Sequence, residues 1–407
     1  MARPGFVLEV DERTPPLLVH QGEGFRLQKF PLGSRVIYPP DSLPKLRGLR
    51  NHIRHALDHP HGSEPLRELL TPGMKLTIAI DDISIPLPPM QSPDIRQLVL
   101  EEVIELAARR GVKDVKLYMA NSLHRRMTAD EIKHAVGERV FRSFYPKDLK
   151  NHDAEDPENL AYVGKTDQGE EVEINKRAME SDLLIYVNIN LVAMDGGHKS
   201  VPVGLASYRS VKHHHNVHTM LHSKSYMDPR PGRSAIHDSC RRMGDVLKAN
   251  GLKVFTIETT MNNNTFPDPF GFMNKREWEW SLVEQGTYLA AKKANDMGPS
   301  AMKHQIWTRI KSPAGVTGIV AGDTDAVHEQ TLATLHRQQL VEVDGQSDIM
   351  VVGLPYICPY NVNSIMNPIL VHCLGLGYLF NLYRNKPVVR PGGAMIMFHP
   401  VPNEFHQ

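Results

Sequence analysis

The segment Leu184–Asn216, LIYVNINLVAMDGGHKSVPVGLASYRSVKHHHN, carries the strongest structural and chemical signals in the chain. Residues 184–189 form a run of β-branched and aliphatic side chains, which is typical of a strand buried in a parallel sheet. The loop Gly196–Lys199 (GGHK) follows, and paired glycines let backbone amides approach a bulky ligand. Its lysine supplies a cation or an amine that can become a covalent anchor. Together with the imidazoles of His213–His215, this loop predicts a functional site at the end of a central strand.

The composition is that of an ordinary globular protein, and the 407 residues are enough for two domains. The net charge of +1 offers no basic surplus for nucleic acid. The three cysteines are scattered without metal-ligand spacing, which favours a reducing compartment. The N-terminus carries acidic residues where a signal peptide needs an apolar core, and the apolar segment Ile365–Phe380 is interrupted by Asn367 and Pro368. We therefore expect a cytoplasmic protein without a membrane span, and a natural chain that can continue past Gln407.

Strand-like and helix-like segments alternate on both sides of Asn262–Gly271, a stretch dense in turn-forming residues. This pattern predicts an α/β fold with two α/β lobes, largely parallel sheets and an active-site cleft between the lobes. The expected domains are residues 1–268, which would bind a cofactor, and residues 269–407. Lys311 is expected where the second lobe meets the first, and two further ligand-binding segments are expected after a strand of the second lobe, namely Gly353–Tyr356 and Asn361–Ser364.

Polar residues follow the predicted strand of residues 75–80, at Asp81, Asp82 and Ser84. Carboxylates at the carboxyl end of a parallel strand lie where α/β sheets bind their ligands. A capped turn before the next helix is the structural alternative, and chemistry alone does not separate the two.

His124 follows the predicted strand of residues 115–120, just before a capping box, Thr128–Glu131, that opens the next helix. Imidazole suits acid–base catalysis because its unperturbed pKa lies near neutrality. A solvated histidine on a surface loop is the structural alternative. His152, on the next loop, is expected to hold that loop, and the alternative is that it faces the site.

The GGHK loop and the histidine run have three other possible interpretations. The loop lacks the glycine directly before the lysine and the earlier glycine of a phosphate-binding P-loop, which argues against an NTPase. A zinc hydrolase is disfavoured because adjacent histidines point in different directions and no HExxH motif or cysteine pair joins them. A histidine-rich loop that stabilises an α/β domain without any cofactor remains open.

The loop, the histidine run and the two strand ends resemble the lactate racemase family, whose members use a nickel-pincer nucleotide. The family's Ser-Gly-Gly-x-Lys loop is matched by Asp195–Lys199 except at its first residue. The resemblance implies that Lys199 holds the cofactor covalently and that His215, sixteen residues later, is the nickel ligand. A single imidazole suffices in a tetragonal nickel site whose other donors come from the cofactor. The family also has an Asp-rich turn and a Gly-x-His-Arg segment upstream.

By the same resemblance, Asp81, Asp82, Ser84, Gly196 and Gly197 are expected to bind the cofactor, whose phosphate needs amide donors or cations. His124 is expected to act as a catalytic acid–base. The implied activity is that of an isomerase, a racemase or epimerase of a 2-hydroxy acid that works by hydride transfer. The implied partners are that substrate and the enzymes that make the cofactor, with a homo-oligomer also expected.

Two family features are absent from this chain. The substrate-gripping arginine is replaced by Ile85, and Ile189–Leu191 stands where the family has a second catalytic histidine. The substrate is therefore expected to differ from lactate, and residues His198, His213 and His214 remain equal candidates for the second base. A different reaction on the same cofactor, or a nickel-pincer or nucleotide-binding protein without turnover, is the alternative.

Overall fold

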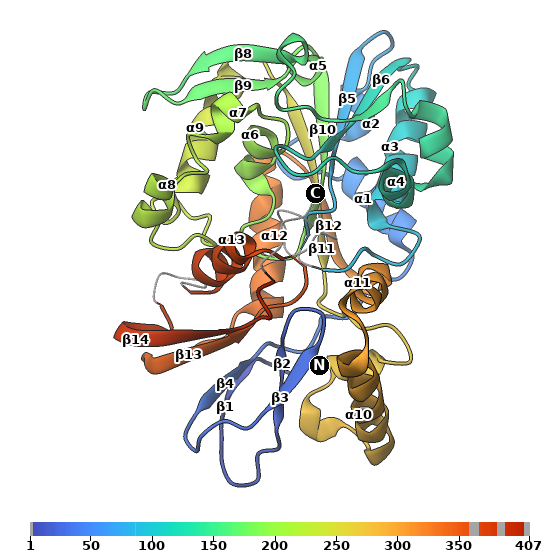
Figure 1. The fold of residues 1–407 in the computed structure, drawn as a ribbon. Helices are drawn as coiled ribbons and strands as arrows, with labels where there is room; N and C mark the ends of the chain where they lie inside the picture. The colour runs from blue at the N-terminus through green and yellow to red at the C-terminus, as the bar shows by residue number, and fades with distance from the viewer. Residues whose placement is uncertain (1–2, 86, 358–365, 381–386, 403–407) are drawn as a thin grey trace.

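The computed structural model describes residues 3–85, 87–357, 366–380 and 387–402, and it consists of two lobes (Figure 1). The first lobe is built on a six-stranded sheet, and the second contains two-stranded sheets and helices. The predicted α/β class is confirmed. No helix in the described part of the chain is long and apolar enough to cross a membrane.

The large sheet has the strand order β12-β11-β10-β5-β6-β7. All neighbours run parallel except β12, which pairs antiparallel with β11. All eight residues of the central β10 are buried, which explains its continuous run of apolar residues. The strands are β5 (Lys75–Asp81), β6 (Asp114–Ala120), β7 (Leu149–Asn151), β10 (Leu183–Asn190), β11 (Val254–Met261) and β12 (Val316–Gly322).

Helices cover both faces of this sheet, and each face has its own apolar core. On one face, Ile185, Val187 and Ile189 of β10 pack with α1 (Leu49–Asp58), α2 (Leu66–Leu69), α3 (Ile95–Arg109) and α4 (Ala129–Phe144). On the other, Leu184 and Tyr186 pack with α5 (Lys176–Met179), α6 (Ser200–Gly204), α7 (Tyr208–Val211), α9 (Ala235–Ala249) and the hairpin β8 (Leu160–Lys165) and β9 (Glu171–Asn175). The remaining elements of this lobe are α8 (Val217–His222) and α12 (Thr324–Gln339), which packs on β11 and β12.

The second lobe is assembled from both ends of the chain. An aromatic core joins Leu18, Phe25 and Leu27 to Phe272, Trp280 and Tyr288. Its sheets are the antiparallel pairs β1 (Phe6–Glu9) with β4 (Arg35–Tyr38) and β2 (Leu17–His20) with β3 (Phe25–Gln28), and the parallel pair β13 (Ser347–Gly353) with β14 (Val389–Phe398). Its helices are α10 (Leu282–Met297), α11 (Ser300–Arg309), α13 (Pro368–His372) and the π-helical segment Cys373–Leu379.

This assembly corrects two details of the sequence-based prediction. Strand β12 and helix α12 lie after residue 268 but complete the first lobe, while the N-terminal strands belong to the second. A single boundary at residue 268 therefore does not separate the lobes. The sheets of the second lobe are small and mixed in direction within the described residues, whereas the prediction made them largely parallel.

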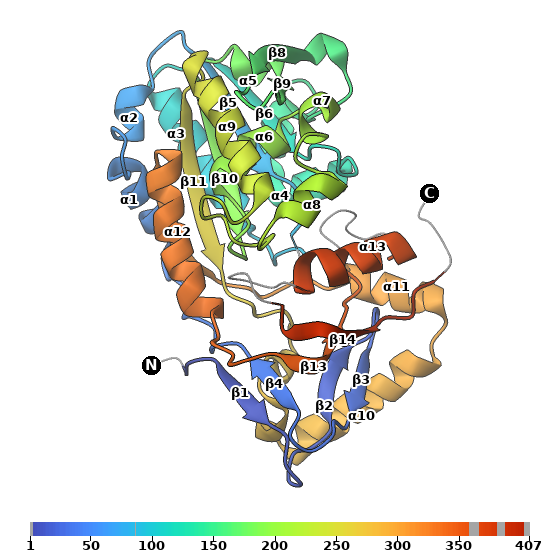
Figure 2. The same ribbon diagram turned by 90° about the vertical axis from the view of Figure 1, so that its left-hand side faces the viewer.

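The carboxyl ends of the parallel strands point toward the second lobe (Figure 2). The loops that follow β5, β6 and β10 therefore lie at one edge of the sheet, between the lobes. Met194 and Tyr226 of the first lobe pack with Tyr378 of the second at this edge. Parallel α/β sheets bind ligands at this edge, so the residues on these loops define the candidate site.

Candidate active site

Lys199 lies on the loop that follows β10, at the end of a short 3₁₀ helix, Gly197–Lys199. Its side chain is half-buried, and its amine makes no hydrogen bond or ion pair within the described residues. Burial is the main cause of the low pKa values of His214, His215 and His237, and the charge of Lys199 lowers all three further. The amine therefore lies among these three imidazoles.

Gly196 and Gly197 have positive φ angles of 78° and 60°, a conformation that favours glycine. A Cβ atom on Gly196 would overlap the side chains of Asn190 and Glu258, and one on Gly197 would lie 2.8 Å from His328 Cδ2. The glycines are therefore required by the packing of the loop against the sheet and α12, whether or not a ligand is bound.

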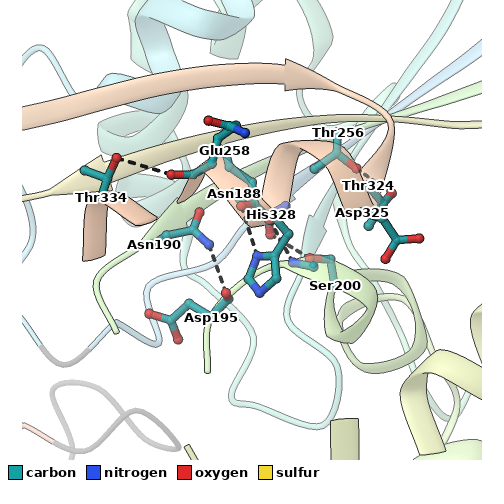
Figure 3. A network of polar contacts seen from close by, with 12 residues as sticks. Asn188, Asn190, Asp195, Ser200, Thr256, Glu258, Thr324, Asp325, His328 and Thr334 are labelled. Atoms are coloured by element: carbon teal, nitrogen blue, oxygen red, sulfur yellow. Dashed lines mark hydrogen bonds and ion pairs between the residues drawn. The ribbon is translucent and has the colours of Figure 1, made fainter. Parts of the chain in front are cut away.

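Glu258 on β11 holds this loop, and the sequence analysis missed it (Figure 3). Its side chain is fully buried; Oε1 accepts the Gly197 N–H at 2.7 Å, and Oε2 lies 3.2 Å from His328 Nδ1. The Gly197 amide thus has a protein partner, so the expected donation to a cofactor phosphate would require exchange of that bond. The only sequence signal was a lone acidic residue within an apolar strand.

Two asparagines of β10 also orient this loop (Figure 3). Asn190 Nδ2 donates to the carbonyl oxygen of Asp195 at 3.0 Å, and Ser200 Oγ donates to Asn188 Oδ1 at 2.9 Å. These bonds connect the strand to both sides of Lys199 and restrict the position of its backbone.

His214 and His215 follow α7, and their contacts determine which ring nitrogen carries each proton. Nε2 of the buried His214 lies 3.2 Å from the carbonyl oxygen of Pro202, which can only accept, so this nitrogen carries the proton. Burial lowers the pKa of His214 to about 4, so the ring is neutral and Nδ1 is an acceptor. Nδ1 of His215, 2.7 Å away, must then donate. This leaves the lone pair of His215 Nε2 for another ligand.

Asp82 orients His124. Its Oδ2 atom lies 3.0 Å from His124 Nδ1, and its Oδ1 atom accepts the Ser84 N–H at 2.9 Å and the Ser84 hydroxyl. Burial opposes ionisation of Asp82, but His124 and Ser84 outweigh it and lower the pKa of the carboxyl group. An ionised carboxylate on Nδ1 fixes the proton there, so proton exchange with a substrate would use Nε2. Asp82 and Ser84, expected to bind the cofactor, are thus engaged with each other and with His124.

Asp81 has a different environment from its neighbour. Its Oδ2 atom accepts the Ile189 N–H at 2.8 Å, yet burial and the nearby Asp82 and Asp195 raise its pKa to about 8. The buried Arg96 donates to the carbonyl oxygens of Asp81 and Asp82 at 2.8 and 2.6 Å and holds the turn in place.

The loops carrying His124 and Lys199 are joined directly. The Ser122 N–H donates to the carbonyl oxygen of Gly204 in α6 at 3.1 Å, and Ser122 has a positive φ of 49°. The charge of His124 is also one of the influences that lower the pKa of His215, after burial, His214 and Lys199. The loops that carry Lys199 and His124 are therefore neighbours, and the charges of both residues reach His215.

A family model described as the lactate racemase N-terminal domain matches residues 24–228, just over half of the chain. The chain belongs to the lactate racemase family. It is 29% identical over 167 residues to a lactate racemase of Thermoanaerobacterium thermosaccharolyticum and 28% identical over 168 residues to one of Lactiplantibacillus plantarum. These alignments cover 40% of this chain in each case, but only 37% and 38% of the relatives' own lengths.

The fold agrees with this membership of the lactate racemase family. The structure of the lactate racemase apoprotein from Thermoanaerobacterium thermosaccharolyticum matches 94% of this chain and 73% of its own chain, with a TM-score of 0.57. At 18% identity this match is evidence for the shared fold alone.

The residues of this lactate racemase family member fit the nickel-pincer nucleotide that the resemblance implies. His215 presents an unprotonated Nε2, and its other ring nitrogen is held by a neighbour, as is common for metal-binding histidines. Nearby, His237 on α9 is buried, and neither of its ring nitrogens makes a hydrogen bond of normal geometry. Buried ring nitrogens without a protein partner are able to bind a ligand. No three His, Cys, Asp or Glu side chains in the described residues are grouped so that they could hold a metal ion by themselves.

The three candidates for a second base all have other contacts in the structure. His198 Nε2 lies 2.6 Å from Asp325 of α12, and His213 Nε2 lies 3.6 Å from Glu171. His214 is occupied by Pro202 and His215. The geometry of the site therefore does not identify any one of the three as the second base. His152 Nε2 lies 3.0 Å from the carbonyl oxygen of Ala206, which agrees with a role in holding its loop.

Two expectations for the second lobe have different outcomes. Lys311 does lie where the lobes meet, because Ser312 next to it forms a bridge with Met90 of the first lobe. The predicted ligand-binding segment Asn361–Ser364 lies outside the described residues.

Proposed function

We propose that this chain is a racemase or epimerase of a 2-hydroxy acid and that it carries a nickel-pincer nucleotide attached to Lys199. Membership of the lactate racemase family supports an isomerase. When bound, the cofactor supplies a hydride acceptor that removes and returns the hydrogen on the 2-carbon of the substrate.

The observation that carries the proposal is the convergence of three groups with complementary chemistry. Lys199 offers an amine with no partner among the described residues, and His215 offers an unprotonated Nε2. His124, held by Asp82 at 3.0 Å, offers a base. An amine for attachment, a nitrogen for nickel and a base for the substrate hydroxyl are the groups that this reaction needs from the protein.

In this proposal, His124 Nε2 takes the proton of the substrate hydroxyl as the hydride leaves the adjacent carbon. Asp82 stabilises the imidazolium that forms, because its carboxylate accepts the Nδ1–H of His124. His124 would return the proton to the same oxygen at the end of the reaction, which would leave the 2-carbon with inverted configuration.

The experiment is expression of the chain with and without the enzymes that make the cofactor. We expect intact-mass measurement to find an adduct only with those enzymes, and we expect Lys199→Ala to abolish it. The exposed lysine Lys253 provides the matched control, Lys253→Ala. The loaded protein should invert a single enantiomer of a 2-hydroxy acid in chiral chromatography, and His124→Ala should not. An adduct that survives Lys199→Ala would contradict the anchor, and full nickel loading without inversion would contradict the reaction.

A second function is kept because of Ile85 and Ile189–Leu191, which replace the arginine and the second histidine of the resemblance. The same cofactor would then serve a different reaction, or be bound without turnover. In that case the Lys199 adduct would form as above, and no member of a broad panel of 2-hydroxy acids and sugar acids would be inverted.

A further inference from the structure

A cavity of about 280 Å³ opens at the carboxyl edge of the large sheet, on the face covered by α3 and α4. Most of its wall is apolar, with contributions from the carboxyl ends of β10 and β11 and from the loop after β5. The apolar wall residues that matter below are Ile83, Ile85, Leu87, Met90, Ile189 and Met261.

The cavity adjoins the groups that orient the proposed base. Ile83 directly follows Asp82, and the backbone N–H of Ile189 donates to Asp81 at 2.8 Å. Arg96, another wall residue, donates to the carbonyl oxygens of Asp81 and Asp82. The cavity therefore begins one residue from the carboxylate that holds His124.

Lys311 is the wall cation with no hydrogen bond or ion pair among the described residues. Arg96, by contrast, is buried and satisfied by Asp94, to which it donates at 3.0 and 2.7 Å, and by the two backbone carbonyls. The Lys311 side chain is half-buried; burial lowers its pKa, and the charge of Glu131 opposes that shift. Glu131 and Asp130 of α4 are also wall residues, and Glu131 is paired with Arg125 at 2.8 Å. An unpaired cation at an apolar wall is a binding site for an anion, most simply a carboxylate.

The rim that carries Lys311 is rigidly joined to the opposite rim. The Ser312 N–H donates to the carbonyl oxygen of Pro89 at 2.8 Å, and the Gln91 N–H donates to the carbonyl oxygen of Ser312 at 2.9 Å. His134 Nε2 of α4 lies 2.7 Å from the Met90 carbonyl oxygen. The cavity is thus a preformed space rather than a gap between loose loops, which reduces the cost of ordering it on binding.

We propose that this cavity binds the side chain of the substrate, and that the substrate is a 2-hydroxy acid with a branched aliphatic or aromatic substituent whose carboxylate pairs with Lys311. This inference rests on the proposed function for the reaction at the 2-carbon. Ile85 and Ile189, the two positions at which the chain departs from the family pattern, are both in the wall. A small or charged substituent leaves this apolar wall uncovered.

The test is a series of single-enantiomer acids titrated into the purified full chain by calorimetry, before and after cofactor loading. The series is lactate, 2-hydroxybutyrate, 2-hydroxyisocaproate and 3-phenyllactate, with malate as the charged comparison. We expect affinity to rise by about fourfold for each buried methylene group, and malate to bind more weakly than 2-hydroxyisocaproate. Equal affinity along the series, no binding of any member, or preference for malate would each overturn the proposal.

Two variants test separately the contributions of the apolar wall and of Lys311 to affinity. Ile85→Ser should weaken 3-phenyllactate at least tenfold and leave lactate nearly unchanged, whereas Ile306→Ser, at an isoleucine of α11 that is 51% exposed, should change neither. Lys311→Gln should weaken all the acids alike, and Lys253→Gln should not. Thermal unfolding checks that each variant is folded, and the wild-type series decides the question if one is not.

The outcomes also distinguish this inference from the proposed function. If affinity follows the apolar series but the loaded protein inverts none of the acids, the subsite stands and the racemase proposal fails. If the loaded protein inverts lactate or a sugar acid as well as 3-phenyllactate, and Ile85→Ser changes nothing, the racemase proposal stands and the subsite fails.

Discussion

The Nδ1 atoms of His214 and His215 lie 2.7 Å apart, and the carbonyl oxygen of Pro202 decides which of them carries the proton. The contact from Pro202 to His214 Nε2 makes His214 the acceptor of this pair and His215 the donor. A buried backbone carbonyl therefore determines, through one histidine, the ring nitrogen that the next histidine can offer to a metal.

Replacing His214 by Phe should reduce nickel retention by the loaded protein. The substitution removes the acceptor for His215 Nδ1–H, and loss of such a partner typically costs about 10- to 100-fold in metal affinity. Metal analysis after dialysis against a chelator measures the effect. His213→Gln, at the preceding histidine, should retain nickel as the wild type does. Equal retention by a folded His214→Phe protein would contradict the assignment of the His215 proton.

Asp82→Asn should lower the rate of inversion by about 10²- to 10⁴-fold without preventing adduct formation at Lys199. The amide can donate to His124 Nδ1, which moves the imidazole proton to Nε2 and removes the base. Turnover by chiral chromatography and adduct formation by intact mass are measured on the same preparations. Ser84→Ala, which removes one hydrogen bond to Asp82 but leaves the His124 contact, should lose less than Asp82→Asn. An Asp82→Asn protein as active as the wild type would show that the contact between Asp82 and His124 has no role in catalysis.

Gly196→Ala should destabilise the protein more than Gly169→Ala does. The two glycines have nearly the same φ, 78° and 79°, so both alanines pay about 1–2 kcal/mol of backbone strain. Only at Gly196 does the added Cβ meet Asn190 and Glu258, whereas nothing lies within 4 Å at Gly169. Urea unfolding of the two variants isolates the contribution of packing beneath the loop. Equal losses of stability would show that the loop can shift to admit a side chain.

Asp81 should make the protein less stable as the pH rises. Its pKa is about 8 in the folded protein against 3.8 in the unfolded chain, so in this window the folded state holds a proton that the unfolded state releases. The contribution of Asp81 to stability is fully present below about pH 4 and is lost as the pH rises through about 8. Asp81→Asn should remove this dependence, on the order of a few kcal/mol across the window. Urea unfolding of both proteins at several pH values measures it, and parallel pH profiles would refute it.

Much of the first lobe was predictable because its elements have local signals. The apolar run of β10 predicts a buried strand, and Thr128 with Glu131 forms the capping box that opens α4. Helix α12 was missed because its buried face includes Thr331 and Gln338, which interrupt the apolar stripe.

The sequence by itself determined the chemistry of the candidate site. Lys199 precedes His215 by sixteen residues, and a strand end carries Asp81 and Asp82, and both features are evident without reference to the rest of the fold. Only the tertiary structure decided what these groups do with each other. Glu258 accepts the hydrogen bond of the Gly197 N–H although the two residues are 61 positions apart in the sequence. Asp82 contacts His124 across a separation of 42 positions. Parallel strands bring their carboxyl ends to one edge whatever the length of chain between them, so no local pattern specifies these pairs.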